Sequence, residues 1–188
     1  MRNINIFSLI LVLCFLVACD SGKNKTDHSQ HTQTEKSKST AKSPAKSAMA
    51  NIGNVHVHID YNAPSVRNRI IWGGLVPYGE VWVTGAHTAT SINFYGNVEI
   101  AGQTIPKGKY AFFTIPDKEK WTLILNKNWE QHLTDEYNEK EDIIRWEVES
   151  ETTEFAEQLS YEVNSKDSTV ELRWEKVLIK FKVTPLSN

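Results

Sequence analysis

Cysteine is scarce in this sequence: Cys14 and Cys19 are the only two among 188 residues. From residue 20 onward the chain therefore has no thiol for a disulfide, an iron–sulfur cluster, a thiolate-bound zinc or a cysteine nucleophile. Methionine is equally scarce, with two residues, which gives no support to a methionine-rich copper(I) site. We expect a fold that is stable through its packed core alone.

A large charge of one sign and long apolar runs are also missing. The formal net charge of −2 excludes a generally basic nucleic-acid-binding protein, so we expect no nucleic-acid partner. After residue 18 no stretch is apolar enough to cross a bilayer, which excludes a polytopic membrane protein. The sequence contains neither the G-x-S-x-G motif of α/β-hydrolases nor a glycine-rich loop followed by Lys-Ser or Lys-Thr. These absences remove common sequence signals of hydrolases and of nucleotide-binding proteins.

What is present begins with an N-terminal targeting signal. Arg2 precedes an apolar run from Ile6 to Val17, which is too short to span a membrane and has the length of a signal-peptide core. The run ends Leu-Val-Ala-Cys19, which resembles the bacterial lipobox, where the cysteine is acylated and becomes the mature N-terminus. We predict a signal peptide over residues 1–18 and a lipid anchor on Cys19. The alternative is an ordinary secretory signal in which Cys19 is incidental.

A tether over residues 19–50 follows the signal. Between Asp20 and Ala48 there is no Ile, Leu, Val or aromatic residue, so this stretch buries too little apolar surface to offset its ordering entropy, and we expect it to be disordered. Residues 20–50 contain six lysines and three acidic residues, whereas residues 51–188 contain 14 cationic and 20 acidic residues. The tether is thus weakly basic and the domain acidic. Its two histidines, His28 and His31, are candidate metal scavengers.

Residues 51–188 show the alternation of apolar and polar side chains that is typical of half-buried strands. Strict alternation recurs in five segments, residues 55–61, 144–148, 159–163, 170–174 and 179–183. The denser apolar segments 110–115 and 121–125 suit central strands, and turn-forming residues lie between the segments. We predict one all-β domain, an antiparallel β-sandwich or jelly-roll-like fold, with one short helical excursion over residues 128–140.

Four histidines of the domain are candidate metal ligands. Period two places His56 and His58 on the same face of a strand, with Asp60 following as a further or supporting ligand. His87 lies at a strand or loop end, and His132 lies in the excursion. If these places converge, up to four imidazoles surround one ion, a ligand set that suits Zn²⁺ or Cu²⁺. The alternative is a polar pair of histidines on a solvated face, with no ligand.

The run Ile71–Gly85 combines several glycines with large aromatic residues. Its glycines permit close backbone approach, and Trp72, Tyr78 and Trp82 supply large side chains. The run is therefore either a compact packed loop or the rim of a ligand site.

Residues 69–90 read R-I-I-W-G-G-L-V-P-Y-G-E-V-W-V-T-G-A-H-T-A-T, and this run resembles the signature of a bacterial envelope family, domain of unknown function 2911. Residues 105–116, 121–129, 139–142 and 174–176 also resemble the family, so the resemblance extends over about residues 52–184. It implies a secreted or lipid-anchored all-β protein and brings no activity with it. Many members carry Asn-Glu where this chain has His87-Thr88, so a site that uses His87 would belong to a subset of the family.

These observations favour a lipid-anchored protein of the cell envelope, facing the periplasm or the exterior, with a histidine-rich site for Zn²⁺ or Cu²⁺. His56 and His58 would be the central pair, and His87 and His132 the further ligands. We predict a role in metal binding, delivery or tolerance rather than catalysis, because no general base is identifiable beside the histidines. Two alternatives stay open: a glycan- or peptide-binding envelope module with exposed aromatic residues beside the Gly73–Gly85 loop, and a structural lipoprotein without a small ligand.

Overall fold

The computed structural model describes residues 42–187, which form antiparallel sheets and contain a single 3₁₀ turn as their helical part. The all-β, sandwich-like fold expected from the alternation is thereby confirmed. In chain order the elements are β1 (Ala45–Ile52), β2 (Val55–Asn62), β3 (Thr90–Phe94), β4 (Val98–Ile100), β5 (Gln103–Ile105), β6 (Gly108–Ile115), β7 (Lys120–Asn126), η1 (Glu139–Glu141), β8 (Asp142–Glu149), β9 (Glu151–Asn164), β10 (Thr169–Lys182) and β11 (Thr184–Pro185).

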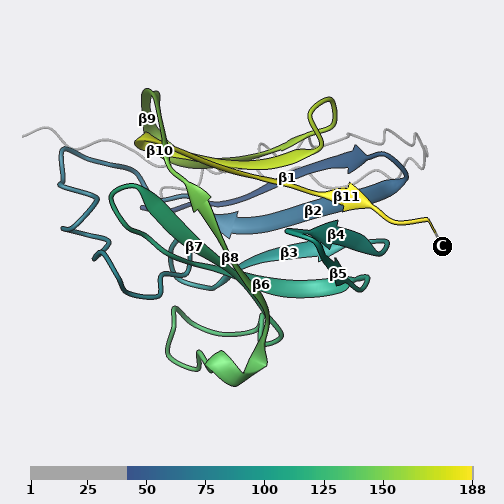
Figure 1. Ribbon diagram of the computed structural model, residues 1–188. Helices are drawn as coiled ribbons and strands as arrows, with labels where there is room; N and C mark the ends of the chain where they lie inside the picture. The colour runs from purple at the N-terminus through teal and green to yellow at the C-terminus, as the bar shows by residue number, and fades with distance from the viewer. Residues whose placement is uncertain (1–41, 188) are drawn as a thin grey trace, which may run out of the picture. The chain divides into compact units, whose positions relative to one another are not determined.

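The first layer is a six-stranded sheet with the strand order β1-β2-β3-β6-β7-β8 (Figure 1). Successive side chains of a strand point to opposite faces, so Ile59 of β2 is buried in the core while His58 and Asp60 point to the other face. The register places Ser47 of β1 and Ser91 of β3 directly opposite Asp60, on either side of it. The face of the sheet that carries Asp60 is called the outer face below, and the face that carries Ile59 the inner face.

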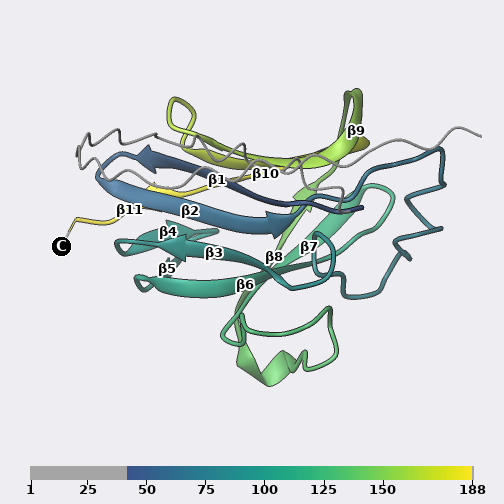
Figure 2. The same ribbon diagram turned by 180° about the vertical axis from the view of Figure 1, so that it is seen from behind.

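The second layer is the long hairpin of β9 and β10, which lies over the inner face (Figures 1 and 2). Strand β9 contacts β1, and β10 contacts β8, so the hairpin runs along both edge strands of the six-stranded sheet. A small sheet of β11, β4 and β5 adjoins these layers. The main apolar core fills the space between the layers and includes Ile59, Phe112, Trp121 and Trp174, each at most 1% exposed.

Strand β10 joins two segments that the alternation predicted separately, residues 170–174 and 179–183. Trp174 and Ile179 both point into the core although one position number is even and the other odd. Register shifts on either side of Glu175, whose φ is +56°, change the phase of the alternation between them. One bulged strand therefore accounts for both patterns.

A second, smaller apolar cluster lies on the outer face over β6 and β7. Its buried members are Val83, Ala89, Ala111, Phe113 and Ile124. Trp129 and Tyr137, from the segment between β7 and β8, pack against it. We call residues 127–141 the excursion. The cluster holds the excursion against the outer face, where it appears as the green loop at the bottom of Figure 1.

Two boundaries differ from the sequence-based prediction. Strand β1 includes residues 45–50, which were assigned to the tether, so the domain begins before residue 51. These residues are mostly small and polar, and they become a strand because each pairs with β2 rather than because they bury much surface. The excursion exists, but in place of a helix over residues 128–140 it contains only the three-residue turn η1.

The predicted signal peptide, Cys19, His28 and His31 lie outside the described residues. Within residues 42–187, no helix has the length and apolar character needed to cross a membrane.

Candidate functional site

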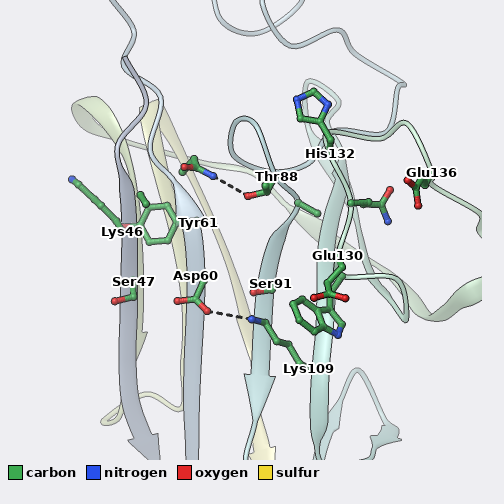
Figure 3. Close-up of a pocket in the computed structure, with 15 residues that line it drawn as sticks. Lys46, Ser47, Asp60, Tyr61, Thr88, Ser91, Lys109, Glu130, His132 and Glu136 are labelled. Carbon is green, nitrogen blue, oxygen red and sulfur yellow. Dashed lines mark hydrogen bonds and ion pairs between the residues drawn. The ribbon is translucent and has the colours of Figure 1, made fainter. Parts of the chain in front are cut away.

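The outer face carries a groove of about 740 Å³, a size within the usual range of small-molecule sites. Its floor is formed by β1, β2, β3 and β6, and one wall is formed by the excursion. Figure 3 shows Ser47, Asp60 and Ser91 on neighbouring strands of the floor, with Glu130, His132 and Glu136 on the excursion side. The groove occupies the part of the outer face that the second apolar cluster leaves open.

Asp60 is the central charged group of the floor. Its Oδ1 lies 2.9 Å from Nε2 of His58, and its Oδ2 lies 3.4 Å from Nζ of Lys109 (Figure 3). The ammonium of Lys109 also lies 4.2 Å from the ring centroid of Trp129. Lys109 thus links the carboxylate of the floor to the indole of the wall, and it keeps two N–H donors for other partners.

The excursion is held in place by a short ladder with the segment before β3. Ala89 N–H donates to Gln131 O at 3.0 Å, and Leu133 N–H donates to His87 O at 2.7 Å. These bonds flank a bridge between Thr88 and His132. The wall of the groove is therefore fixed to the sheet by backbone hydrogen bonds.

At the far end of the excursion, Tyr137 connects it to β8. Its Oη donates to Oδ2 of Asp142 at 2.8 Å and accepts from Nη2 of Arg145. Burial, together with the hydrogen bond to Asp142, raises the pKa of Tyr137 to about 12. The protonated phenol is thus part of the structure that holds the excursion.

Gln131 has an unused acceptor beside the groove. The residue is 5% exposed, and its Nε2 donates to Asn128 O at 2.6 Å, which fixes the orientation of the amide. Its Oε1 is buried and has no donor among the residues that the structure describes. A buried acceptor without a donor costs about 1–3 kcal/mol of folding free energy.

The excursion also contributes two carboxylates without side-chain partners in the described part of the chain, Glu130 and Glu136. They are exposed, and they line the same groove as Asp60. Acceptors therefore outnumber cations here. Lys109 is paired with Asp60, and Lys46 donates to Gln158 outside the groove.

The four histidines predicted as one metal centre separate into two pairs. His56 and His58 share the outer face with ring centroids 6.3 Å apart, as period two predicts. His87 and His132 lie beside each other through the ladder described above, and His132 lines the groove while His56 and His58 do not. In the described range, no set of three or more His, Cys, Asp or Glu side chains is positioned to hold a metal ion. A four-imidazole centre is therefore not formed.

The histidine nitrogens also have other partners. Nδ1 of His56 lies 2.8 Å from Oδ1 of Asn51, and Nδ1 of His132 lies 3.0 Å from Oδ2 of Asp135. Nε2 of His58 contacts Asp60, as described above. Each of these three rings therefore has one nitrogen with a side-chain partner close to it in the sequence. His87 is exposed and has a positive φ of 64°.

The three aromatic residues considered as a ligand rim are Trp72, Tyr78 and Trp82, and none of them lines the groove. Trp72 and Trp82 are half-buried and pack with Trp121 and Trp174, with centroid distances from 4.9 to 6.3 Å. Tyr78 is 38% exposed and lies away from the groove. Trp72 and Trp82 thus belong to a packed tryptophan cluster, whereas residues 73–75 and 77–80 of the same run are exposed.

The sequence reasoning missed most residues of the groove. Ser91 lies on β3, where no strand was predicted from the sequence, and Lys109 lies just before the predicted segment 110–115. Alternation also does not say which strands are neighbours. Ser47 was assigned to the tether, and Gln131 and Glu136 have no motif. Trp129 was noted only as part of the helical segment.

Comparisons with known proteins give one match. Residues 43–183 match the family model described as "Protein of unknown function (DUF2911)". Neither the curated proteins nor the solved structures contain a significant match.

Proposed function

The chain belongs to the DUF2911 family, and from this premise we propose that it is a lipid-anchored envelope protein whose outer-face groove binds a small ligand rich in hydroxyl groups. Saccharides are the class that fits best. The observation that carries the proposal is the polar lining of the groove, which combines the carboxylates of Asp60, Glu130 and Glu136 with the ammonium of Lys109.

The polar groups of the groove favour the same ligand class. The carboxylates of Asp60, Glu130 and Glu136 accept hydrogen bonds, and a sugar hydroxyl can donate to them while accepting from Lys109. Trp129 also lines the groove, where its indole helps to position the ammonium of Lys109, 4.2 Å from the ring centroid. A mostly apolar ligand would leave these groups desolvated without partners, which costs free energy.

The lipid anchor on Cys19 remains part of this proposal and rests on the sequence alone. With residues 1–18 removed and Cys19 acylated, the domain would sit at a membrane of the cell envelope. Acyl chains contribute about 0.8 kcal/mol per buried methylene, so two or more chains give a stable anchor.

A divalent metal is the second candidate, reduced to the pair His56 and His58. The 6.3 Å between their ring centroids favours it, and each ring keeps one nitrogen without a partner in the described residues. Asp60 is a poorer ligand than expected because Lys109 already lies 3.4 Å from its Oδ2. The candidate is therefore a two-imidazole surface site for Zn²⁺ or Cu²⁺.

A thermal-shift screen of neutral and amino sugars, followed by calorimetry on the hits, tests the main proposal. We expect Glu130→Gln and Asp60→Asn each to weaken the binding of a hit about tenfold, since a hydrogen bond to a charged group contributes about 1.5–3 kcal/mol. Glu154→Gln, an exposed glutamate on β9 outside the groove, is the matched control and should bind as the wild type does. Unchanged affinity in both groove variants would contradict the proposal.

Calorimetry with Zn²⁺ and Cu²⁺ tests the second candidate. A double variant, His56→Ala with His58→Ala, should lose the binding, because it removes both imidazole ligands. Equal metal binding by the wild type and the double variant, or none by either, would remove this candidate.

A further inference from the structure

The loop between β2 and β3 ends in an apolar tip that the groove does not use. Ile70 is 79% exposed, Leu75 46% and Tyr78 38%, and all three lie within nine residues of one another in the chain. They belong to the family-signature run described above. Large apolar side chains gathered on one exposed segment often indicate an interaction surface.

The tip is a defined turn rather than a frayed loop. Leu75 N–H donates to Ile70 O at 3.0 Å, and Val76 N–H donates to Ile71 O at 2.9 Å. Ile71 and Val76 are each 2% exposed and belong to the main core. A side chain at Gly74 would place its Cβ 2.5 Å from Ile70 O, so the turn requires glycine there. The buried pair anchors the turn and directs its neighbours outward.

The tip lies at the end of the domain where the described chain begins, at Lys42. This is the end that the tether joins to the predicted anchor. Nη2 of Arg67 donates to Lys42 O at 2.9 Å, and Ala63 N–H donates to Pro44 O at 2.9 Å. In Figure 1 this loop extends at the left, at the end of β2 that is opposite the β1–β2 turn. The described chain therefore begins beside the base of the loop that carries the tip.

The surroundings of the tip are less acidic than the domain as a whole. Near it are the cationic residues Lys42, Arg67 and Arg69 and the carboxylates Glu80, Asp117 and Glu157, three of each sign. Residues 51–188 as a whole contain 14 cationic and 20 acidic residues. The apolar tip thus has cations at its border although the domain is acidic.

We propose that the tip formed by Ile70, Leu75 and Tyr78 enters the interfacial region of a lipid bilayer with anionic headgroups, and that Arg67 and Arg69 contact those headgroups. This rests on the lipid anchoring proposed above, because 22 residues between Cys19 and Lys42 can span at most about 80 Å and so leave the tip within reach of the membrane. Apolar side chains bordered by cations suit the boundary between headgroups and acyl chains. The tip would orient the domain on its membrane.

A single-cysteine label on the mature lipoprotein, reconstituted in vesicles, tests this directly. Once residues 1–18 are removed and Cys19 is acylated, the chain has no free thiol, so Leu75→Cys can carry an environment-sensitive dye at the tip. The matched control is Asn54→Cys, an exposed position in the β1–β2 turn at the other end of β1. Vesicles containing anionic lipid carry a nitroxide quencher at a shallow acyl position.

We expect the dye at position 75 to shift to shorter wavelength and to be quenched severalfold more than the dye at position 54. Adding Ile70→Asp should abolish the difference, and circular dichroism should confirm that this exposed substitution leaves the fold intact. Equal quenching at positions 75 and 54 would overturn the proposal. This result is also expected if the tip docks on a protein, because the vesicles contain only lipid. Persistence of the difference in Ile70→Asp would also overturn it.

The mass of the purified chain reports separately whether Cys19 is acylated. An unacylated Cys19 would end the anchoring proposal by itself. In that case the same two labels, in a chain with Cys19→Ser and without residues 1–18, still decide whether the tip enters lipid.

Discussion

On β2 the side chain of Ile59 is fully buried, whereas that of the next residue, Asp60, is 53% exposed. The inner face of the six-stranded sheet packs under the β9–β10 hairpin, and its outer face carries a small apolar cluster and a polar groove. The contrast in burial is clear on β2, whereas on β6 and β7 both faces are buried. Because alternate residues of a strand serve opposite faces, stability and ligand binding are assigned to neighbouring positions of the same strands. Substitutions on the two faces should therefore have separable effects.

The largest effect is expected in the tryptophan cluster of the inner side. Trp174 is 0% exposed and stacks on Trp82 with centroids 5.8 Å apart, so Trp174→Ala should lower the free energy of unfolding by about 3–5 kcal/mol. Denaturant unfolding measures this. Trp129→Ala, at a half-buried indole of the groove, is the control and should cost less stability while reducing ligand binding. Equal losses of stability would mean that the outer cluster is as important as the core.

The next test uses adjacent residues of β6 that serve opposite faces. Phe113 lies in the outer cluster that holds the excursion, and Phe112 lies in the main core. Each change to alanine should cost about 3 kcal/mol or more. Only Phe113→Ala should also weaken ligand binding by the folded protein, since it releases the wall of the groove. Calorimetry at a temperature where both variants are folded compares them, and parallel loss of binding in both would contradict the separation of faces.

Alkaline pH should loosen the excursion through Tyr137. The pKa of Tyr137 is raised to about 12 in the folded protein from about 10 when unfolded, so folding favours the protonated phenol. The corresponding stability is present below pH 10 and is lost as the pH rises from about 10 to about 12. Tyr137→Phe lacks this titration, so its unfolding free energy should fall less steeply than that of the wild type over the same window. Parallel curves would show that the phenol does not stay protonated in the folded state.

The smallest effect on stability is expected for the polar residues of the outer face. Asp60→Asn and His58→Ala should each change the free energy of unfolding by no more than about 0.5–1 kcal/mol, because their contacts with each other and with Lys109 are partly exposed. Thermal unfolding in the absence of ligand measures this. A loss of several kcal/mol would show that the outer face also stabilises the fold, and the comparison of the two faces would fail.

The alternation in the sequence was sufficient for most of the fold. It located β2, β6, β7, β8 and β9, because each strand has one buried and one solvated side or is buried on both. It missed β1, whose mostly small residues form a strand only by pairing with β2, and it also missed β3, β4 and β5. It also divided β10 in two, since a bulge that changes the phase of alternation has no local signal.

The candidate site was less accessible to sequence reasoning. The pair His56 and His58 is local, and its shared face was predicted correctly. The groove depends on the strand order and on where the excursion folds back, and both are set by contacts between residues far apart in the chain. Gln131 illustrates this, because it lines the groove only where the excursion pairs with the segment before β3.

The β9–β10 hairpin has a further consequence for a chain that would fold after export into a crowded compartment. Edge strands present unpaired backbone groups that can join the sheets of neighbouring molecules and so begin aggregation. The hairpin contacts both edge strands of the six-stranded sheet, β1 through β9 and β8 through β10, and so covers part of each edge. Shortening the hairpin should therefore favour self-association of the sheet even where the remaining core stays folded.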